Sequence, residues 1–505
     1  MTAHQTRTAT ILGVTLFVSY AYFYQAGGWN QNSRFAMIRA ILERHTLQID
    51  AYQLHTGDRA LWRDHYYSDK APGASLTALG PVQVARMVSR AAGVDPASFP
   101  GIAWTSYVAA VATSGLFTVI AALCVFWLSL RWGATTGAAV FAATAYGVAS
   151  PAWAYATMFM GHGQTAGCLM IALAAADALR DCSPSTRRTL ASLIGLSGAW
   201  AVVTEFQAAI PAVLVGLLAL DSVRGADAVR RETLREPQGR PEHGRGLKAS
   251  ERPMTSVIAW IAIGVAVATV PLLVYNTVAF GSPFHLGYAS EEGFKELHTG
   301  FFGITYPKLS TVRELLVGSY RGLLPLSPLM ATVPVGLALL AGKGRAGLAW
   351  VAAGVGAYYL LLNASYFYWE GGWAFGPRQI TPALPFLALG LAPLWDLGRP
   401  AWRVLLLAGW IWGAGITLVA VSTTPQPPAS IKSPVSELLW PAFRDGDLSL
   451  NPQTFVHNSA DVEHLRGGGD AHAAWNLGEI AGLHGLISLL PLLAVWATAA
   501  LLLLL

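Results

Sequence analysis

Long apolar stretches alternate with polar connections along almost the whole chain. A helix needs about 20 apolar residues to cross the hydrocarbon core of a bilayer. By that measure the pattern predicts about twelve transmembrane helices. They lie near residues 9–27, 103–130, 134–153, 163–179, 189–204, 207–220, 256–276, 326–341, 347–364, 379–396, 404–422 and 485–505. We therefore expect an all-α polytopic membrane protein.

The Lys and Arg residues give this bundle an orientation. They are dense in alternate short connections, which the positive-inside rule places in the cytoplasm together with both termini. The basic segment 221–255 is then a cytoplasmic linker, and the first span is a retained anchor, because no small-residue cleavage site follows it. The polar sequence that remains faces outward, in residues 28–102, 277–325, 365–378 and 423–484.

Composition supports this class of protein and excludes others. Only 12% of the residues are charged, about half the share of an ordinary soluble domain, and the mean hydropathy is +0.45. A soluble enzyme and a nucleic-acid-binding protein are therefore excluded. We attribute the net charge of +5 to the basic cytoplasmic loops. The three cysteines lie in apolar segments or in a short basic loop, so we expect no structural disulfide.

The first outer loop, residues 28–102, contains two predicted interfacial helices. Phe35 and Ile38 fall at helical spacing within residues 30–44 with Arg34 on the other side, and residues 73–92 form a second, short apolar piece. Between the two lie Asp50, Asp58, Asp64, His65, Asp69 and Lys70. Such a cluster at a lipid–water boundary is costly unless its charges are paired or bind a ligand. A solvated loop paired with Arg59 and Arg63 is the alternative.

Four motifs in the predicted outer regions resemble those of one enzyme superfamily. They are Tyr67-Ser68-Asp69-Lys70-Ala71-Pro72, the stretch from Tyr275-Asn276 to Gly287-Tyr288, Tyr320-Arg321-Gly322-Leu323, and Gly376-Pro377-Arg378. In order and topology they resemble C-superfamily (GT-C) glycosyltransferases, in particular the protein O-mannosyltransferases and bacterial aminoarabinose transferases (glycosyltransferase family 39-like). The resemblance implies a GT-C-like catalytic module over residues 1–422, followed by an outer segment and a final helix over residues 423–505.

The resemblance also implies a reaction. A sugar would pass, with inversion, from a polyprenyl-phosphate donor to a glycan, lipid or protein acceptor at the outer, periplasmic face of the inner (cytoplasmic) membrane. Membrane lipids would be further partners. Lys70, which matches the lysine of the family, and Arg378 are the expected phosphate-binding residues. The expected substrate-binding residues are Asp69, Glu205, Tyr288, Arg321, Glu370 and Trp373.

The chain departs from the family pattern at the general base. Gln31 and Asn32 occupy the positions where these families carry acids. His162, Asp50 and Asp58 are the remaining candidates for a base. A divalent metal bound by Asp69 together with Asp64, His65 or His285 is left open.

Less specific interpretations accompany these assignments. His162 would be a hydrogen-bonded interfacial residue, and Arg378 would pair with Glu370. The aromatic run 366–373, which could stack on sugar rings, would instead belong to an interfacial belt. For the whole protein the alternatives are a secondary transporter of twelve spans, a polysaccharide polymerase or ligase, and a GT-C scaffold with altered chemistry. A transporter keeps its site near the bilayer midplane and has short loops, whereas this chain has long loops on one face.

Overall fold

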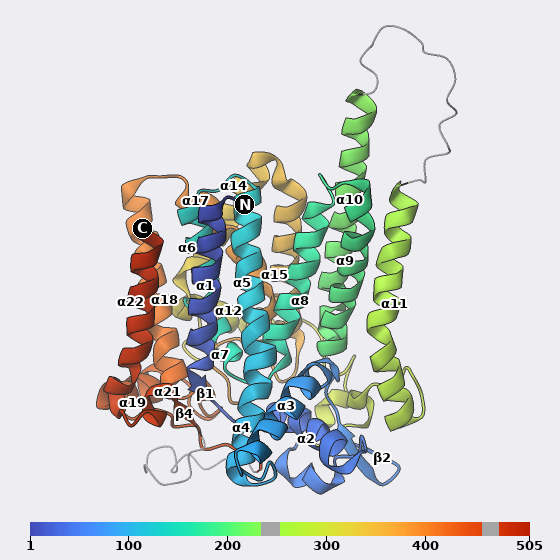
Figure 1. The fold of residues 1–505 in the computed structure, drawn as a ribbon, viewed down its shortest axis with the longest axis vertical. Coiled ribbons are helices and arrows are strands. Elements are labelled where there is room, and N and C mark those ends of the chain that lie inside the picture. Colours follow the sequence, from blue (N-terminus) through green and yellow to red (C-terminus); the bar gives the residue numbers. More distant parts are fainter. Residues whose placement is uncertain (234–252, 457–473, 505) are drawn as a thin grey trace.

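The computed structural model describes residues 1–233, 253–456 and 474–504, and helices make up most of them (Figure 1). Within these ranges, six helical segments are long and apolar enough to cross a membrane. They are Phe99–Arg131, Phe206–Gly225, Met254–Phe280, Pro328–Ser365, Pro400–Ser422 and Gly485–Leu503. The expected all-α polytopic architecture is confirmed.

Shorter helices complete the bundle, and each of the twelve predicted stretches lies largely on helical structure. The first half contains α1 (Ala3–Ala21), α4 (Phe99–Ala110), η2 (Val111–Gly115), α5 (Leu116–Arg131), α6 (Thr136–Gly147), α7 (Ala152–Ala156), α8 (Gly161–Ala178), α9 (Pro184–Thr204), η3 (Phe206–Ala208) and α10 (Ala209–Thr233). The second half contains α11 (Pro253–Phe280), α12 (Leu309–Val317), α13 (Leu323–Leu326), η6 (Pro328–Thr332), α14 (Val333–Leu340), η7 (Ala341–Arg345), α15 (Ala346–Ser365), η8 (Arg378–Ala383), α16 (Leu384–Ala388), α17 (Leu391–Trp395), α18 (Pro400–Ser422), η10 (Gly485–Leu489) and α22 (Leu490–Leu504).

Backbone chemistry explains where this pattern is interrupted. The predicted span 379–396 is divided into η8, α16 and α17, and prolines at 382, 385 and 393 remove the amide donors that a continuous helix would use. The segment Pro328–Ser365 is a helical hairpin, because Lys343 and Gly344 leave helical geometry and Gly344 has a φ of 79°. Glycine adopts that conformation without the steric cost that other residues incur.

Helices α9 and α11 pack against each other through glycines. A Cβ atom on Gly195 would lie 2.0 Å from the carbonyl oxygen of Ile261, and one on Gly264 would lie 2.3 Å from that of Ser192. Only glycine, which has no Cβ atom, allows the two helix backbones to approach this closely. Small residues at such contacts are typical of helices that associate within membranes.

Both chain termini lie at one end of the bundle, and the first outer loop covers the other end (Figure 1). That loop folds into α2 (Trp29–Arg44), η1 (Asp50–His55), the hairpin of β2 (Arg59–Trp62) and β3 (His65–Ser68), and α3 (Gly73–Ala91). The two predicted helices are therefore present. The expected exposed polar face of the first is wrong, however, because residues 31–38 of α2 are all buried, Arg34 included.

The C-terminal outer segment closes over the same end. It carries η9 (Val435–Leu439), α19 (Trp440–Asp445), β4 (Trp475–Asn476) and α21 (Leu477–Ile480). Strand β4 pairs with β1 (Phe23–Tyr24) in antiparallel register, so the segment that follows the first helix is bonded directly to the segment that precedes the last one. Between α11 and α12 lie η4 (Gly287–Ser290) and η5 (Lys295–His298). Residues 234–252 of the predicted linker 221–255 lie outside the described ranges.

Candidate active site

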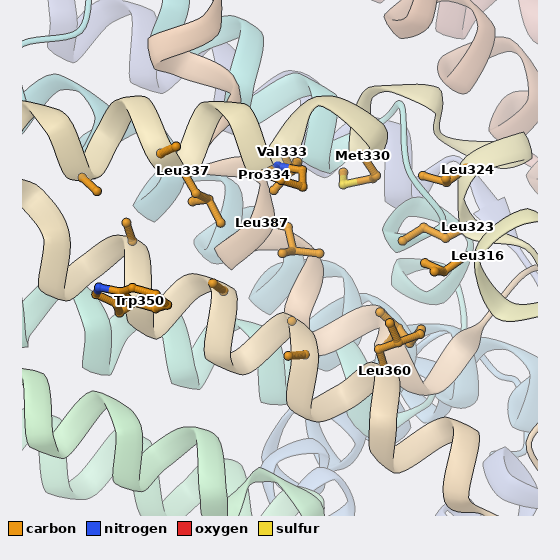
Figure 2. A pocket seen from close by; sticks show the side chains of 17 residues that line it. Leu316, Leu323, Leu324, Met330, Val333, Pro334, Leu337, Trp350, Leu360 and Leu387 are labelled. Carbon is orange, nitrogen blue, oxygen red and sulfur yellow. The ribbon is translucent and has the colours of Figure 1, made fainter. Parts of the chain in front are cut away.

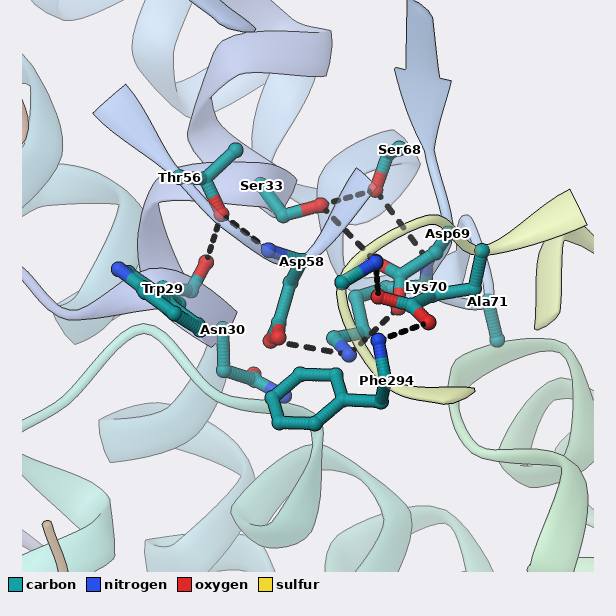
Figure 3. A network of polar contacts seen from close by, with 12 residues as sticks. Trp29, Asn30, Ser33, Thr56, Asp58, Ser68, Asp69, Lys70, Ala71 and Phe294 are labelled. Atoms are coloured by element: carbon teal, nitrogen blue, oxygen red, sulfur yellow. Dashed lines mark hydrogen bonds and ion pairs between the residues drawn. The ribbon is translucent and has the colours of Figure 1, made fainter. Parts of the chain in front are cut away.

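Lys70 lies between two carboxylates at the end of the bundle that the first outer loop covers (Figure 3). Its Nζ is 2.9 Å from Oδ2 of Asp58 and 2.7 Å from Oδ2 of Asp69. The side chains of Lys70, Asp58 and Asp69 are 10%, 9% and 1% exposed. An ammonium group has three N–H donors, so this arrangement leaves one donor for an oxygen atom of a ligand.

Short hydroxyl side chains fix the loops that carry this cluster. Thr56 Oγ1 donates to the carbonyl oxygen of Trp29 and accepts the amide hydrogen of Asp58. Ser33 Oγ, from α2, is 3.3 Å from Oδ1 of Asp69 and 2.8 Å from Ser68 Oγ. Because the backbone on both sides of the cluster is tethered, the two carboxylates are held in place before any ligand arrives.

Burial and mutual charge set the protonation of this cluster. Burial alone lowers the pKa of Lys70, but Asp58 and Asp69 outweigh it and raise the pKa above its usual value. Burial raises the pKa of Asp69, and the charge of Asp58 adds to the rise, while Lys70 opposes it. Lys70 is therefore cationic at neutral pH, and Asp69 is the carboxyl that is held to its proton more strongly than usual.

A polar cavity of about 410 Å³ opens beside Asp58. Four aromatic side chains line it, together with amide groups, three glycines, Met160 and one cation. The lining residues are Gly28, Trp29, Asn30, Asp58, Met160, Phe294, Tyr368, Gly371, Gly372, Trp373, Arg378, Gln426 and Gln453. The volume suits a small polar ligand and its first contacts.

Arg378 is the cation of this cavity, and it makes no hydrogen bond or ion pair within the described ranges. Its Nε is buried and has no partner there. The ion pair with Glu370 that we considered is therefore not formed in this structure. The stem of Arg378 packs on Gly371, where a Cβ atom would lie 3.0 Å from Nε. Arg378 is half-buried, and its charge lowers the pKa of Glu205 without forming an ion pair with it. Its free N–H groups therefore place this guanidinium well to bind an anionic ligand.

An apolar cavity of about 630 Å³ is lined by side chains of the second half of the bundle (Figure 2). Its walls come from α12, α13, η6, α14, η7, α15, η8 and α16, and Leu337, Trp350 and Leu387 are among the lining side chains. Ile380 lines it as well, two residues after Arg378 on η8. One helical turn thus borders a charged, polar cavity and an apolar one.

His162, Glu205 and Arg34 form a second buried group. Glu205 Oε1 is 2.8 Å from His162 Nδ1 and 4.0 Å from Arg34 Nη2, and Arg34 Nη1 donates to the carbonyl oxygen of Ala71. Burial raises the pKa of Glu205. The charge and hydrogen bond of His162 and the charge of Arg34 lower this pKa by more than burial raises it, so the net shift is downward. The group thus joins α2, α8 and the residue after Lys70.

The two amides that replace the expected acids make structural contacts. Gln31 donates to the carbonyl oxygen of Gly27 and to Gln426 Oε1, and its own Oε1 accepts the amide hydrogen of Phe159. Asn32 donates to the carbonyl oxygens of residues 55 and 454. An acid at position 31 or 32 would lack the donors for these contacts, which accounts for the amides.

Arg321 has a different environment from the one we expected. It is fully buried, and it donates to the carbonyl oxygens of Glu370 and Gly372 while lying over the ring of Tyr320. These contacts hold the backbone of the loop that carries Trp373. Arg321 therefore positions a wall of the cavity without lining it. Tyr288 does lie near the cluster, with its ring centre 5.4 Å from Lys70 Nζ.

Asp50 is not among the lining residues of the cavity, and it pairs with His65 at 2.8 Å, where both side chains are a little under half exposed. The expected metal ligands do not converge: within the described ranges, no group of three or more His, Cys, Asp or Glu side chains could hold a metal ion. Both oxygens of Asp69 already contact Lys70 and Ser33, and His285 bonds Ser290. We therefore assign no step to a metal ion.

Several residues of the cavity escape sequence reasoning. Trp29, Phe294, Gln426 and Gln453 come from three separate outer segments, and none belongs to a motif, whereas Tyr368 belongs to the aromatic run 366–373. The glycine pair before Trp29 was the one available signal, since Gly27 and Gly28 both have positive φ. Nothing in the sequence around Gln426 and Gln453 marked these two side chains as members of a site.

Comparison with known proteins gives structural matches alone. No protein-family model matches the chain, and neither does any curated protein. Among solved structures, ArnT from Cupriavidus metallidurans bound to undecaprenyl phosphate is similar, with 15% identity and a TM-score of 0.48. The same protein in the apo state gives 15% identity and a TM-score of 0.47. Each match covers 84% of this chain and 66% of the other, so the chain spans just under two thirds of those proteins.

Proposed function

We propose that this protein is a GT-C-like membrane glycosyltransferase that moves a sugar from a polyprenyl-phosphate donor to an acceptor hydroxyl. The observation that carries the proposal is the position of Arg378. Its unpaired guanidinium lines a polar cavity that Asp58 also lines, while Ile380 on the same turn lines an apolar cavity. A ligand with a phosphate head and a long apolar tail matches this pair of cavities.

In the proposed reaction the acceptor oxygen attacks the sugar carbon that bears the phosphate. Asp58 takes the proton of the attacking hydroxyl, and the bond from that carbon to the phosphate oxygen breaks. The charge that develops on the departing lipid phosphate is stabilised by Arg378 and by the remaining donor of Lys70. Attack from the face opposite the phosphate inverts the configuration. Asp58 fits the role of base better than His162 or Asp50, because Asp58 is the one of the three that lines the polar cavity.

The membrane orientation belongs to the same proposal. Both cavities are bordered by η8, and the polar one is lined mainly by residues of the outer segments. The folded first outer loop lies at the end of the bundle opposite the chain termini (Figure 1). With the termini in the cytoplasm, as the Lys and Arg distribution predicts, this site works at the periplasmic face of the inner membrane. Acceptor glycans, lipids or proteins would reach it from that side.

The test uses purified protein in lipid nanodiscs with radiolabelled undecaprenyl-phosphate sugars, and undecaprenyl phosphate itself as a binding probe. We expect Arg378→Gln to weaken binding of the sugar-free lipid, and Asp58→Asn to abolish turnover while binding persists. Arg313→Gln, at an exposed outer position, is the matched control. Absence of lipid binding and turnover in the wild type, together with ion-driven solute uptake in vesicles, would instead establish the transporter alternative.

A further inference from the structure

Two glutamines of the C-terminal outer segment face the polar cavity side by side. Gln426 and Gln453 are 3% and 6% exposed, and both line the cavity next to Gly28. A Cβ atom on Gly28 would lie 2.7 Å from Gln426 Nε2 and 2.8 Å from Gln453 Oε1. Gly28 has a φ of 101°, so its missing side chain leaves the space into which the two amide ends project.

The orientation of Gln426 is fixed by its neighbours. Its Oε1 accepts hydrogen bonds from Gln31 Nε2 at 3.2 Å and from Asn451 Nδ2 at 2.9 Å. Both neighbours are donors at those atoms, so the oxygen of Gln426 must point toward them. The NH₂ group of Gln426 is then the end that faces Gly28 and the cavity.

Gln453 presents the complementary atom. Its Oε1 is buried and has no hydrogen-bond partner within the described ranges. A buried acceptor of this kind destabilises the protein until a donor satisfies it. Gln453 is also a lining residue of the cavity, so a ligand bound beside Gly28 is the nearest source of that donor. The wall at Gly28 therefore offers one N–H donor and one free acceptor.

A sugar hydroxyl fits this pair because it donates and accepts at once. The rest of the cavity suits the same ligand, since Trp29, Phe294, Tyr368 and Trp373 supply apolar ring faces. Arg378 supplies the positive charge for the phosphate that would join the sugar to its lipid. The aromatic run 366–373, which as a sequence resembles an interfacial belt, thus has two members in the cavity wall.

We propose that Gln426 and Gln453 recognise a ring hydroxyl of the sugar substrate by hydrogen bonds and so determine the sugar specificity of the site. This inference rests on the proposed function and deepens it by naming the group that is recognised. Gln453 accepts the hydroxyl hydrogen and Gln426 donates to the hydroxyl oxygen. The hydroxyl belongs either to the transferred sugar or to a glycan acceptor, and the two sources have different kinetic signatures.

The experiment compares Gln453→Met with Gln83→Met, a control at an exposed position on α3. Methionine keeps the length of the side chain but removes the acceptor. We expect Gln453→Met to weaken binding of undecaprenyl-phosphate hexoses about 10-fold or more, and to leave the dissociation constant of sugar-free undecaprenyl phosphate unchanged. Deoxy-sugar donors that lack the recognised hydroxyl should bind the wild type and Gln453→Met equally well.

Two further arms complete the design. If the hydroxyl is on the acceptor, Gln453→Met raises the acceptor KM and leaves donor hydrolysis intact. Gly28→Ala should reproduce the loss, because its Cβ would displace both amides. Unchanged affinities and KM values in a folded Gln453→Met protein, or an equal loss for the sugar-linked and sugar-free lipids, would overturn the inference. Failure of the wild type to bind either lipid would refute the proposed function instead.

Discussion

Replacing Lys70 by methionine tests the electrostatic account of the site most directly. The substitution keeps the apolar stem but leaves Asp58 and Asp69, 9% and 1% exposed, without the cation between them. Removing one partner of a buried ion pair costs about 3–5 kcal/mol. We expect a loss of unfolding free energy of that order at neutral pH, in addition to loss of phosphate binding.

The pH dependence supplies the sharper test. Without Lys70, burial and the charge of Asp58 are no longer opposed by that cation, so the pKa of Asp69 rises further above its unfolded value. The destabilisation is then greatest well above the folded pKa, and it is relieved as the pH falls through that pKa toward the unfolded value. A cost of about 3 kcal/mol corresponds to about two pKa units, because one unit is worth about 1.4 kcal/mol.

Thermal unfolding in nanodiscs between about pH 5 and pH 8 measures this effect. Lys308→Met, at an exposed outer lysine, is the control, and Asp58→Asn combined with Lys70→Met should recover part of the lost stability. A Lys70→Met protein as stable as the wild type at pH 8, or a destabilisation independent of pH, would show that the three side chains do not form the coupled cluster described above.

Three other outcomes follow from the same structure. Arg321→Lys should cost about 2–3 kcal/mol of unfolding free energy and raise the donor KM, because lysine lacks the planar fork that binds two loop carbonyls; wild-type behaviour in both assays would contradict this. Glu205→Gln should destabilise the protein at neutral pH, and the deficit should shrink below about pH 4.5, where the wild type loses the advantage of its lowered pKa; unfolding across that range decides. Chelation with EDTA should leave turnover intact, whereas recovery of activity only on adding Mg²⁺ or Zn²⁺ would restore the metal hypothesis.

Part of the candidate site could be predicted because its residues are local in sequence. Asp69 and Lys70 adjoin in one motif, and Arg378 begins η8 beside prolines that also mark the motif. The roles were harder to assign. Arg321 lies in a motif as conspicuous as these, yet its guanidinium is used entirely on backbone carbonyls and on the ring of Tyr320. A motif gives the residue type, whereas the partners come from the fold.

The sequence by itself determined the helices and the outer segments that carry the candidate site. Apolar length is a local property, so the spans and the helices α2 and α3 could be predicted from short windows. The division of the predicted span 379–396 was not predicted, although the prolines that cause it are visible in the sequence. Tertiary structure decided which charged and polar side chains meet. His162 and Glu205 are 43 residues apart, and Gln31 and Gln426 are 395 apart. Such pairs form because buried polar groups need partners, and the packing of distant segments selects which partner is near.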